Sequence, residues 1–339
     1  MSQLKNPITL TPPIRGFPEY GYPLSILFSR DDKFWPWLYH NYIMVVFNKK
    51  NNSFHHACYD WMHLTEGVFK YNYLYMPKYI LNKPMLIINI LKEVLRHGGY
   101  IIGTFNEYYI PQRKAYNSYN FDHEYMIYGY SSNQSFNVIG YTDKKLYEST
   151  SVTCNEYLNA LKNTNFDAKN ITISSLTINE EFKPVFNLDK CIMFVNDYIY
   201  CYSNNYKYNV DDYYFGIDAL KFLINYLDSV VKENKFIDIR NFYFLWEHKK
   251  LMVNRIEFLI KNNIILNNLN IYEKYKDNLH ISASLKNLAI KYNQVKNRTI
   301  LIKMQQYIET IIREEIKMLS YLQNDLLVYK ILKSTDCYE

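Results

Sequence analysis

A change of hydrophobic periodicity near residue 153 constrains the fold of this 339-residue chain more than any other feature. Before it, residues 100–105, 123–130 and 136–142 form short runs that are rich in β-branched and aromatic residues and bounded by turn residues, which predicts strands. After it, apolar residues recur at helical spacing, which predicts helices over residues 155–161, 217–227, 242–260, 283–292 and 299–332. We therefore expect an α+β protein in which a domain with a mixed sheet is followed by a mainly helical region.

The N-terminal part also contains helical signals. Residues 86–95 have a regular apolar stripe and end at Gly98-Gly99, a typical helix C-cap, while residues 23–29 could open another helix. Residues 38–47 are aromatic and β-branched enough to predict a strand. Because one core rarely exceeds roughly 250–300 residues, we expect two domains, 1–163 and 164–339, the second completing or covering the cleft of the first.

Composition excludes several classes of function. The net charge of +6 comes from 39 basic and 33 acidic residues spread along the chain, so no basic stripe predicts nucleic-acid binding. No apolar run predicts a membrane span, and no export signal or nucleotide loop is recognisable. We expect a cytoplasmic protein without metal or other cofactor, because its five cysteines are odd in number and form no CxxC pair. They are Cys58, Cys154, Cys191, Cys201 and Cys337.

The segment from residue 92 to 130 contains the clearest candidate for a catalytic residue. It places a histidine, His123, at the start of a strand, where an imidazole at the rim of a sheet suits a general base. Its runs LRHGGYIIGTFNEYYIP and FDHEYMIYGYSSNQSFNVIGY resemble the histidine half of the cysteine-peptidase-like domain of the butirosin biosynthesis protein H family. They are also similar to relatives from nonribosomal peptide and closthioamide-type clusters. YYFGIDALKFLINYL and DIRNFYFLWEHKKLMVNRIEFL resemble the helical region that follows this domain.

The resemblance implies a papain-like fold with catalytic residues in the order Cys, His, then Asp or Asn. His123 then matches the general base, and Cys58 is the only cysteine that precedes it. Cys58 follows His55 and His56 and could open a helix, an environment that favours the thiolate. A buried, inert thiol is the alternative, because the chain has EYGYPLSIL where the family's first helix would carry a cysteine, near positions 20–22.

A third residue should orient the imidazole. Asp143 lies twenty positions after His123, close to the spacing of papain-like enzymes, and Asn137 is the alternative. An oxyanion would be stabilised by Asn106 or by the backbone N–H of Cys58.

A tyrosine-rich loop over residues 108–119 is expected to line the substrate site. We assign substrate binding to Asn106 together with Tyr109 and Tyr116 of this loop. Arg113 and Lys114 would form a basic patch for an acidic carrier protein.

The family relationship implies a cysteine-dependent acyl or amide transferase of secondary metabolism. An acyl group would pass from a carrier-protein thioester to Cys58 and then to an amine, with His123 as base. The alternative is a non-catalytic protein that binds or scaffolds components of a peptide-synthetase cluster, and a peptidase is a third option. Homodimer formation stays open.

Overall fold

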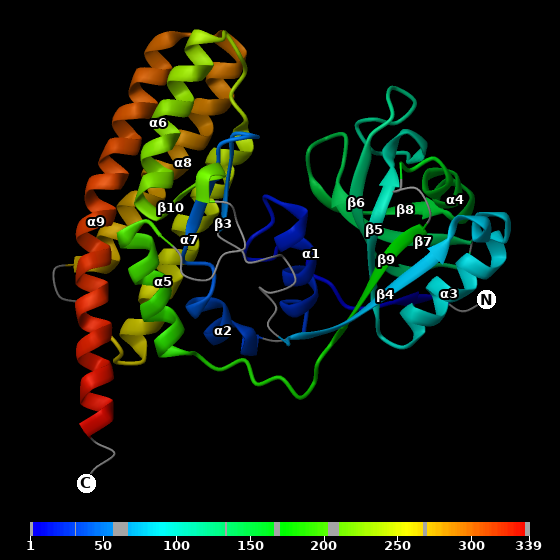
Figure 1. Cartoon of the computed structure of the whole chain (residues 1–339), viewed down its shortest axis with the longest axis horizontal. Coiled ribbons are helices and arrows are strands. Elements are labelled where there is room, and N and C mark those ends of the chain that lie inside the picture. Colours follow the sequence, from blue (N-terminus) through cyan, green and yellow to red (C-terminus); the bar gives the residue numbers. More distant parts are fainter. Residues whose placement is uncertain are drawn as a thin grey trace. The chain divides into compact units, whose positions relative to one another are not determined.

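The computed structural model describes residues 3–30, 32–56, 67–132, 134–165, 170–202, 210–266 and 270–335. Contacts divide the chain into two compact units. Unit 1 comprises Met1–Asp32 and Thr65–Lys183, and unit 2 comprises Lys33–Leu64 and Pro184–Glu339. The expected α+β class is confirmed, because antiparallel sheets are joined to a helical C-terminal region (Figure 1). A division at residue 163 would separate strand β9 (Asn170–Ile178) from the sheet in which it pairs.

Unit 1 is built on one antiparallel sheet with the strand order β4-β9-β5-β6-β7-β8, and β1 pairs with the end of β6. The expectation of a mixed sheet is wrong, because every strand pair in the described residues is antiparallel. The strands are β1 (Leu4–Lys5), β4 (Phe69–Pro77), β5 (Tyr100–Asn106), β6 (Asp122–Tyr130), β7 (Ser135–Tyr141), β8 (Tyr147–Thr153) and β9 (Asn170–Ile178).

The strands expected over residues 100–105, 123–130 and 136–142 are confirmed as β5, β6 and β7. A tight turn joins β6 to β7, in which the backbone N–H of Ser131 donates to the carbonyl of Ser135 at 2.9 Å. Strand β9, by contrast, lies in a stretch for which the sequence indicated no element.

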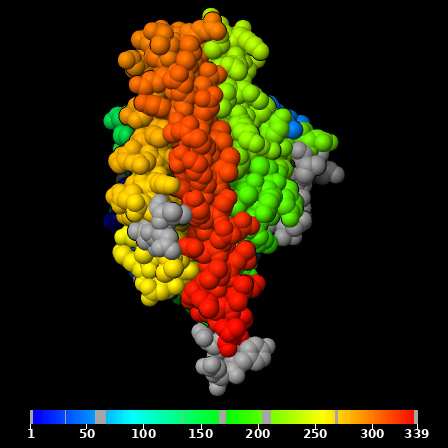
Figure 2. Space-filling model, turned by 90° about the vertical axis from the view of Figure 1, so that its left-hand side faces the viewer, coloured from blue at the N-terminus to red at the C-terminus, as the bar shows by residue number. Residues whose placement is uncertain are grey.

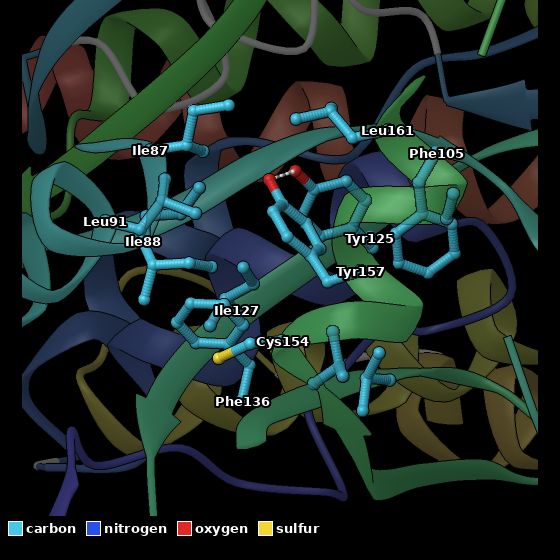
Figure 3. Close-up of a cluster of buried hydrophobic side chains, with 14 of the residues drawn as sticks. Ile87, Ile88, Leu91, Phe105, Tyr125, Ile127, Phe136, Cys154, Tyr157 and Leu161 are labelled. Carbon is cyan, nitrogen blue, oxygen red and sulfur yellow. Dashed lines mark hydrogen bonds between the residues drawn. The ribbon is translucent and has the colours of Figure 1, made fainter. Parts of the chain in front are cut away.

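Two helices cover one face of this sheet, α3 (Pro84–Arg96) and α4 (Cys154–Lys162). Helix α3 buries Ile87, Leu91 and Leu95, as its periodicity predicts, and ends before Gly98, whose φ of 74° suits glycine. Helix α4 starts with a capping box between Thr153 and Glu156. Their side chains meet those of β5, β6 and β7 in one apolar core (Figure 3).

Helix α1 (Pro18–Leu27) packs on the opposite face. Its Ser25 hydroxyl hydrogen-bonds the Tyr147 hydroxyl at 3.1 Å, and Tyr22 stacks on the same ring. Tyr147 and Val152 of β8 point to opposite faces because side chains alternate along a strand, and Val152 belongs to the core under α3 and α4.

Unit 2 is mainly helical. Helix α9 packs against α5, α6 and α8 and runs along the outside of the unit (Figure 2). A small sheet of order β10-β2-β3 packs beside α6 and α7. The elements are α2 (Trp35–His40), β2 (Val45–Asn48), β3 (Ser53–His56), α5 (Leu188–Tyr200), β10 (Tyr213–Phe215), α6 (Gly216–Lys232), α7 (Ile239–Lys261), α8 (Ile271–Val295) and α9 (Arg298–Thr335). No helix in the described residues is long and apolar enough to cross a membrane.

The predicted strand over residues 38–47 is partly wrong, because its first residues belong to helix α2 and only the end forms β2. The cause is tertiary. The buried guanidinium of Arg255, on α7, donates to the carbonyl oxygens of Tyr39 and Asn41 at 2.6 and 2.7 Å, which satisfies the end of the short helix.

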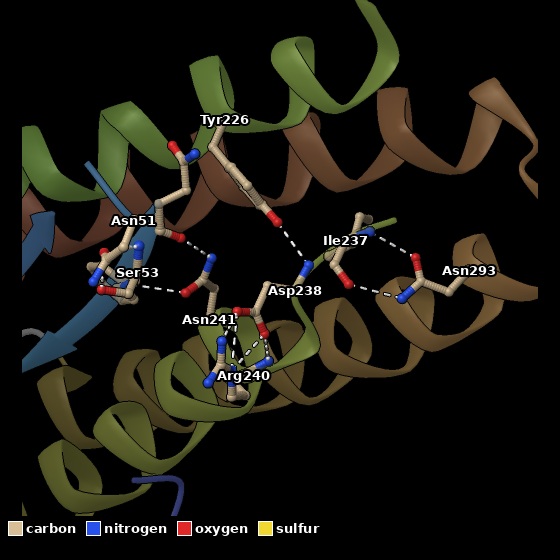
Figure 4. Close-up of polar contacts among 10 residues, drawn as sticks. Asn51, Ser53, Tyr226, Ile237, Asp238, Arg240, Asn241 and Asn293 are labelled. Carbon is tan, nitrogen blue, oxygen red and sulfur yellow. Dashed lines mark hydrogen bonds and ion pairs between the residues drawn. The ribbon is translucent and has the colours of Figure 1, made fainter. Parts of the chain in front are cut away.

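The start of α7 is fixed by polar contacts from three other elements (Figure 4). Asp238 caps the helix, and its backbone N–H donates to the Tyr226 hydroxyl of α6 at 2.7 Å. Asn241 accepts from the backbone N–H of Phe54 in β3 at 2.8 Å, and Asn293 of α8 makes two hydrogen bonds with Ile237.

Candidate functional site

His123 is the second residue of β6 and lies beside the end of β5. The two strands pair so that Phe105 faces His123, and strand alternation puts His123 on the face of Tyr125. That face is the one covered by α3 and α4, since Tyr125 belongs to their core. The ring of Phe121 stacks on the imidazole with the centroids 5.3 Å apart.

A carboxylate lies at this imidazole. Glu107 directly follows β5, and its Oε1 lies 3.4 Å from Nδ1 of His123. The Glu107 side chain is 8% exposed and that of His123 33%. Burial raises the pKa of Glu107, and the positive charge of Arg113 opposes that shift. A carboxylate at Nδ1 favours the tautomer that carries its proton there, so Nε2 is the ring atom suited to accept a proton.

Asn106 holds the loop that carries Glu107. Its Nδ2 donates to Asn120 Oδ1 at 2.9 Å and to the carbonyl of Asn163 at 3.0 Å. Its Oδ1 accepts from the backbone N–H groups of Tyr108 and Phe121 at 3.0 and 3.2 Å. These four bonds use both protons and both lone pairs of the amide, so Asn106 has no capacity left for an oxyanion or substrate in this conformation.

The ladder between β6 and β7 stops at the pair Met126–Ile139, and two side chains bind the carbonyls beyond it. The Tyr22 hydroxyl donates to the carbonyl of Glu124 at 3.0 Å, and Nη1 of Arg113 donates to the carbonyl of Tyr141. The Tyr22 hydroxyl and the Arg113 guanidinium therefore lie where β6 and β7 no longer pair.

Gly140 allows this close approach. A Cβ there would lie 2.8 Å from Nη1 of Arg113 and 3.1 Å from the Tyr22 hydroxyl. Burial raises the pKa of Tyr22, with Arg113 opposing the shift and Glu124 and Glu107 adding to it. Tyr22, Glu107, Arg113 and His123 thus belong to one electrostatic cluster, which we call the sheet-end cluster.

Arg113 and Lys114 do not form the expected basic patch. Lys114 is exposed, but Arg113 is only 4% exposed and points inward. The sequence offered no signal for this burial beyond the position of Arg113 in an aromatic loop between two strands.

The expected nucleophile, Cys58, lies outside the described residues. The first helix of unit 1, where the family resemblance would place a cysteine, has Tyr20, Gly21 and Tyr22 at those positions. Tyr20 and Tyr22 are both buried.

The three described cysteines are free thiols in protected surroundings. Cys154 begins α4 but packs into the apolar core, and burial raises its pKa (Figure 3). Burial raises the pKa of Cys191 to about 12, and it also raises that of Cys201. Each of these thiols is therefore protonated at neutral pH.

The remaining expected site residues lie in different surroundings. Asp143 is exposed in the turn after β7, where its backbone N–H donates to the carbonyl of Gln112 at 2.9 Å. Asn137, its alternative, is buried in β7. Tyr109 packs partly against the core of α3 and α4, and Tyr116 is 42% exposed. The orienting role of Asp143 stays a prediction, and Glu107 is a second carboxylate suited to it.

Within the part of the chain that the structure describes, no group of three or more His, Cys, Asp or Glu side chains could hold a metal ion. Comparison of the sequence with models of known protein families and with curated proteins finds no match.

Proposed function

We propose that unit 1 is a binding module that uses the sheet-end cluster to hold a ligand without catalysing a thiol reaction. The observation that carries this proposal is that helix α1 has a tyrosine, Tyr22, at the cluster. This helix brings the phenol of Tyr22 to the cluster at the positions where a thiol enzyme of the resembled family would carry its cysteine. A phenol that is buried and already donates to a backbone carbonyl is a poor nucleophile.

The hydrogen bonds around the cluster support the same function. Asn106 and Tyr22 have their donors engaged by the protein itself, so neither has a proton to offer to an oxyanion. The ligand would be a component of a peptide-synthetase pathway, in keeping with the family that the sequence resembles.

Intact-mass analysis after incubation with an acyl-pantetheine thioester tests this proposal. We expect no acyl adduct on the wild-type protein, and no difference between the wild type and Cys58→Ala. Iodoacetamide at mildly acidic pH should label Cys58 no faster than a free model thiol, because no activated thiolate is expected. A stoichiometric adduct that Cys58→Ala abolishes would overturn the binding function.

A second candidate is the acyl or amide transferase in which a carrier-protein thioester acylates Cys58 and an amine accepts the acyl group. The Glu107–His123 pair favours it, because a buried carboxylate at Nδ1 is the arrangement that orients a catalytic imidazole.

If transfer is detected, two isosteric variants identify the carboxylate that orients His123. We expect Glu107→Gln to lower the transfer rate by about 100-fold or more, because the amide no longer stabilises the imidazolium. Asp143→Asn should change the rate less than twofold. Equal losses in the two variants would return the role to Asp143.

A further inference from the structure

Arg113 is buried, and two of its three guanidinium nitrogens have no hydrogen-bond partner among the described residues. Its Nη1 donates to the carbonyl of Tyr141, but Nε and Nη2 have no hydrogen-bond partner among the described residues. These two nitrogens form one edge of the planar guanidinium, and their N–H bonds run parallel. This edge is the fork that binds a planar two-oxygen group.

No carboxylate of the described residues forms an ion pair with this edge. Glu107 is close enough for the charge of Arg113 to act on its pKa, yet it contacts His123 instead. A buried cation is costly unless an anion and hydrogen bonds compensate for its lost hydration. Among the residues that the structure describes, the Nε/Nη2 edge of Arg113 therefore has no anionic partner.

The charges around Arg113 select the kind of anion. Glu107 and Glu124 both act electrostatically on Tyr22, which contacts the same glycine as Arg113. Two neighbouring carboxyl groups disfavour a phosphate, which carries up to two negative charges and needs more donors than one guanidinium edge supplies. A carboxylate has one charge and two oxygens at the spacing of the Nε and Nη2 protons.

The surroundings of Arg113 also indicate the rest of the ligand. Arg113 belongs to the loop between β5 and β6, and its guanidinium lies at Gly140 of β7. The backbone N–H of Tyr116 donates to the carbonyl of Arg113, and Tyr116 and Phe121 are 42% and 44% exposed. Phe121 stacks on His123, which links these aromatic rings to the cluster.

We propose that the Nε/Nη2 edge of Arg113 binds the carboxylate of a small organic acid whose apolar body packs against the aromatic side chains of this loop. The proposal rests on the binding function proposed above and specifies its ligand class.

Isothermal titration of the full chain with phenylacetate, its neutral isostere phenylacetamide, and inorganic phosphate tests this subsite. We expect saturable 1:1 binding of phenylacetate, with phenylacetamide and phosphate at least tenfold weaker. Arg113→Lys keeps one charge and a donor for Tyr141 but removes the fork, so it should weaken phenylacetate binding at least tenfold. Arg96→Lys, at a half-exposed arginine of the same unit, should change it less than twofold.

Circular dichroism should show that both variants keep the wild-type spectrum. If Arg113→Lys loses it, Tyr116→Ala replaces that variant, and we then expect a loss of at least threefold in phenylacetate affinity, because the phenyl group of the ligand loses an aromatic contact.

The inference is overturned if the wild type does not bind phenylacetate, if phenylacetamide or phosphate binds as tightly, or if Arg113→Lys has no effect. An acyl adduct on Cys58 together with intact phenylacetate binding would overturn the binding function but leave this subsite in place.

Discussion

At the scale of single residues, Gly216 opens α6 in a backbone conformation that suits glycine. Its φ is 54°, and an added Cβ would lie 2.1 Å from the carbonyl oxygen of Tyr198. We expect Gly216→Ala to destabilise unit 2 by about 2–5 kcal/mol, since left-handed strain and a backbone clash add together. Thermal unfolding followed by far-UV circular dichroism measures the loss.

Gly98 is the matched control for this substitution. Its φ of 74° is also left-handed, but nothing lies within 4 Å of an added Cβ. Gly98→Ala should therefore cost only about 1–2 kcal/mol, the strain alone. Equal losses for the two variants would mean that the expected clash between the added Cβ and the Tyr198 carbonyl oxygen contributes nothing.

At the scale of elements, one ion pair joins α7 to α9 inside unit 2. Nζ of Lys249 lies 2.8 Å from Oε2 of Glu315, and both side chains are fully buried. We expect Lys249→Met to destabilise the unit by about 3–5 kcal/mol, because it leaves the Glu315 carboxylate buried without its cation. Urea unfolding followed by circular dichroism measures this change.

Two further variants separate charge from packing. Lys249→Met with Glu315→Leu should recover most of the loss, because no unpaired charge then stays in the core. Lys317→Met, on the exposed side of α9, should cost less than about 0.5 kcal/mol. A double variant as unstable as Lys249→Met alone would show that lost packing dominates.

Hydrophobic periodicity correctly predicted those elements whose tertiary contacts agree with the local sequence pattern. Helix α3 has an apolar stripe and a glycine stop, and β6 has its turn, so both were predictable. Helix α2 was not, because the carbonyls at its end are bound by Arg255, more than two hundred residues away. The local sequence pattern also did not predict the strand order of the sheet, because β9 pairs with β4 and β5 from a distant part of the sequence.

The candidate site was predictable only in part. His123 is marked by its position at the start of a strand, and the structure puts it at the sheet end beside Glu107. Glu107 and Arg113 carry no motif of their own, and their roles come from a loop that folds back onto β6 and β7. Burial depends on tertiary structure, which the local sequence does not show. We therefore expected Arg113 in an exposed patch, whereas the structure buries it.

At the scale of the whole molecule, the two units differ in their buried titratable groups. In unit 2, burial lowers the pKa of His40 to about 4 and also lowers those of His55, His56 and His248. In unit 1, burial raises the pKa of Glu107 and Glu124. Lowered histidine pKa values destabilise the folded state on acidification, and raised carboxyl pKa values have the opposite sign.

The histidine contribution is fully present above the unfolded pKa of 6.5 and decreases as the pH falls toward the folded values. With its folded pKa of about 4, His40 therefore costs unit 2 about 2 kcal/mol at pH 5 relative to pH 7, and the other buried histidines act in the same direction. Asp197 in the same unit opposes this, since burial raises its pKa from 3.8 to about 6 and it takes up a proton as the pH falls. Burial also raises the pKa of Asp325 in this unit. These two carboxyl groups offset only part of the effect of the four histidines, so unit 2 should lose stability between pH 7 and 5.

Tryptophan fluorescence can follow unit 2 selectively, because Trp35, Trp37 and Trp246 all belong to it. In a Trp61→Phe background, we expect the fluorescence melting midpoint to fall between pH 7 and 5. Hydrogen exchange at the β6 amides should show unit 1 unchanged or more stable over the same range. Adding His248→Gln should flatten the pH slope of unit 2, whereas the exposed control His97→Gln should not. A parallel decline of both units on acidification would contradict the assignment of the acid-sensitive groups to unit 2.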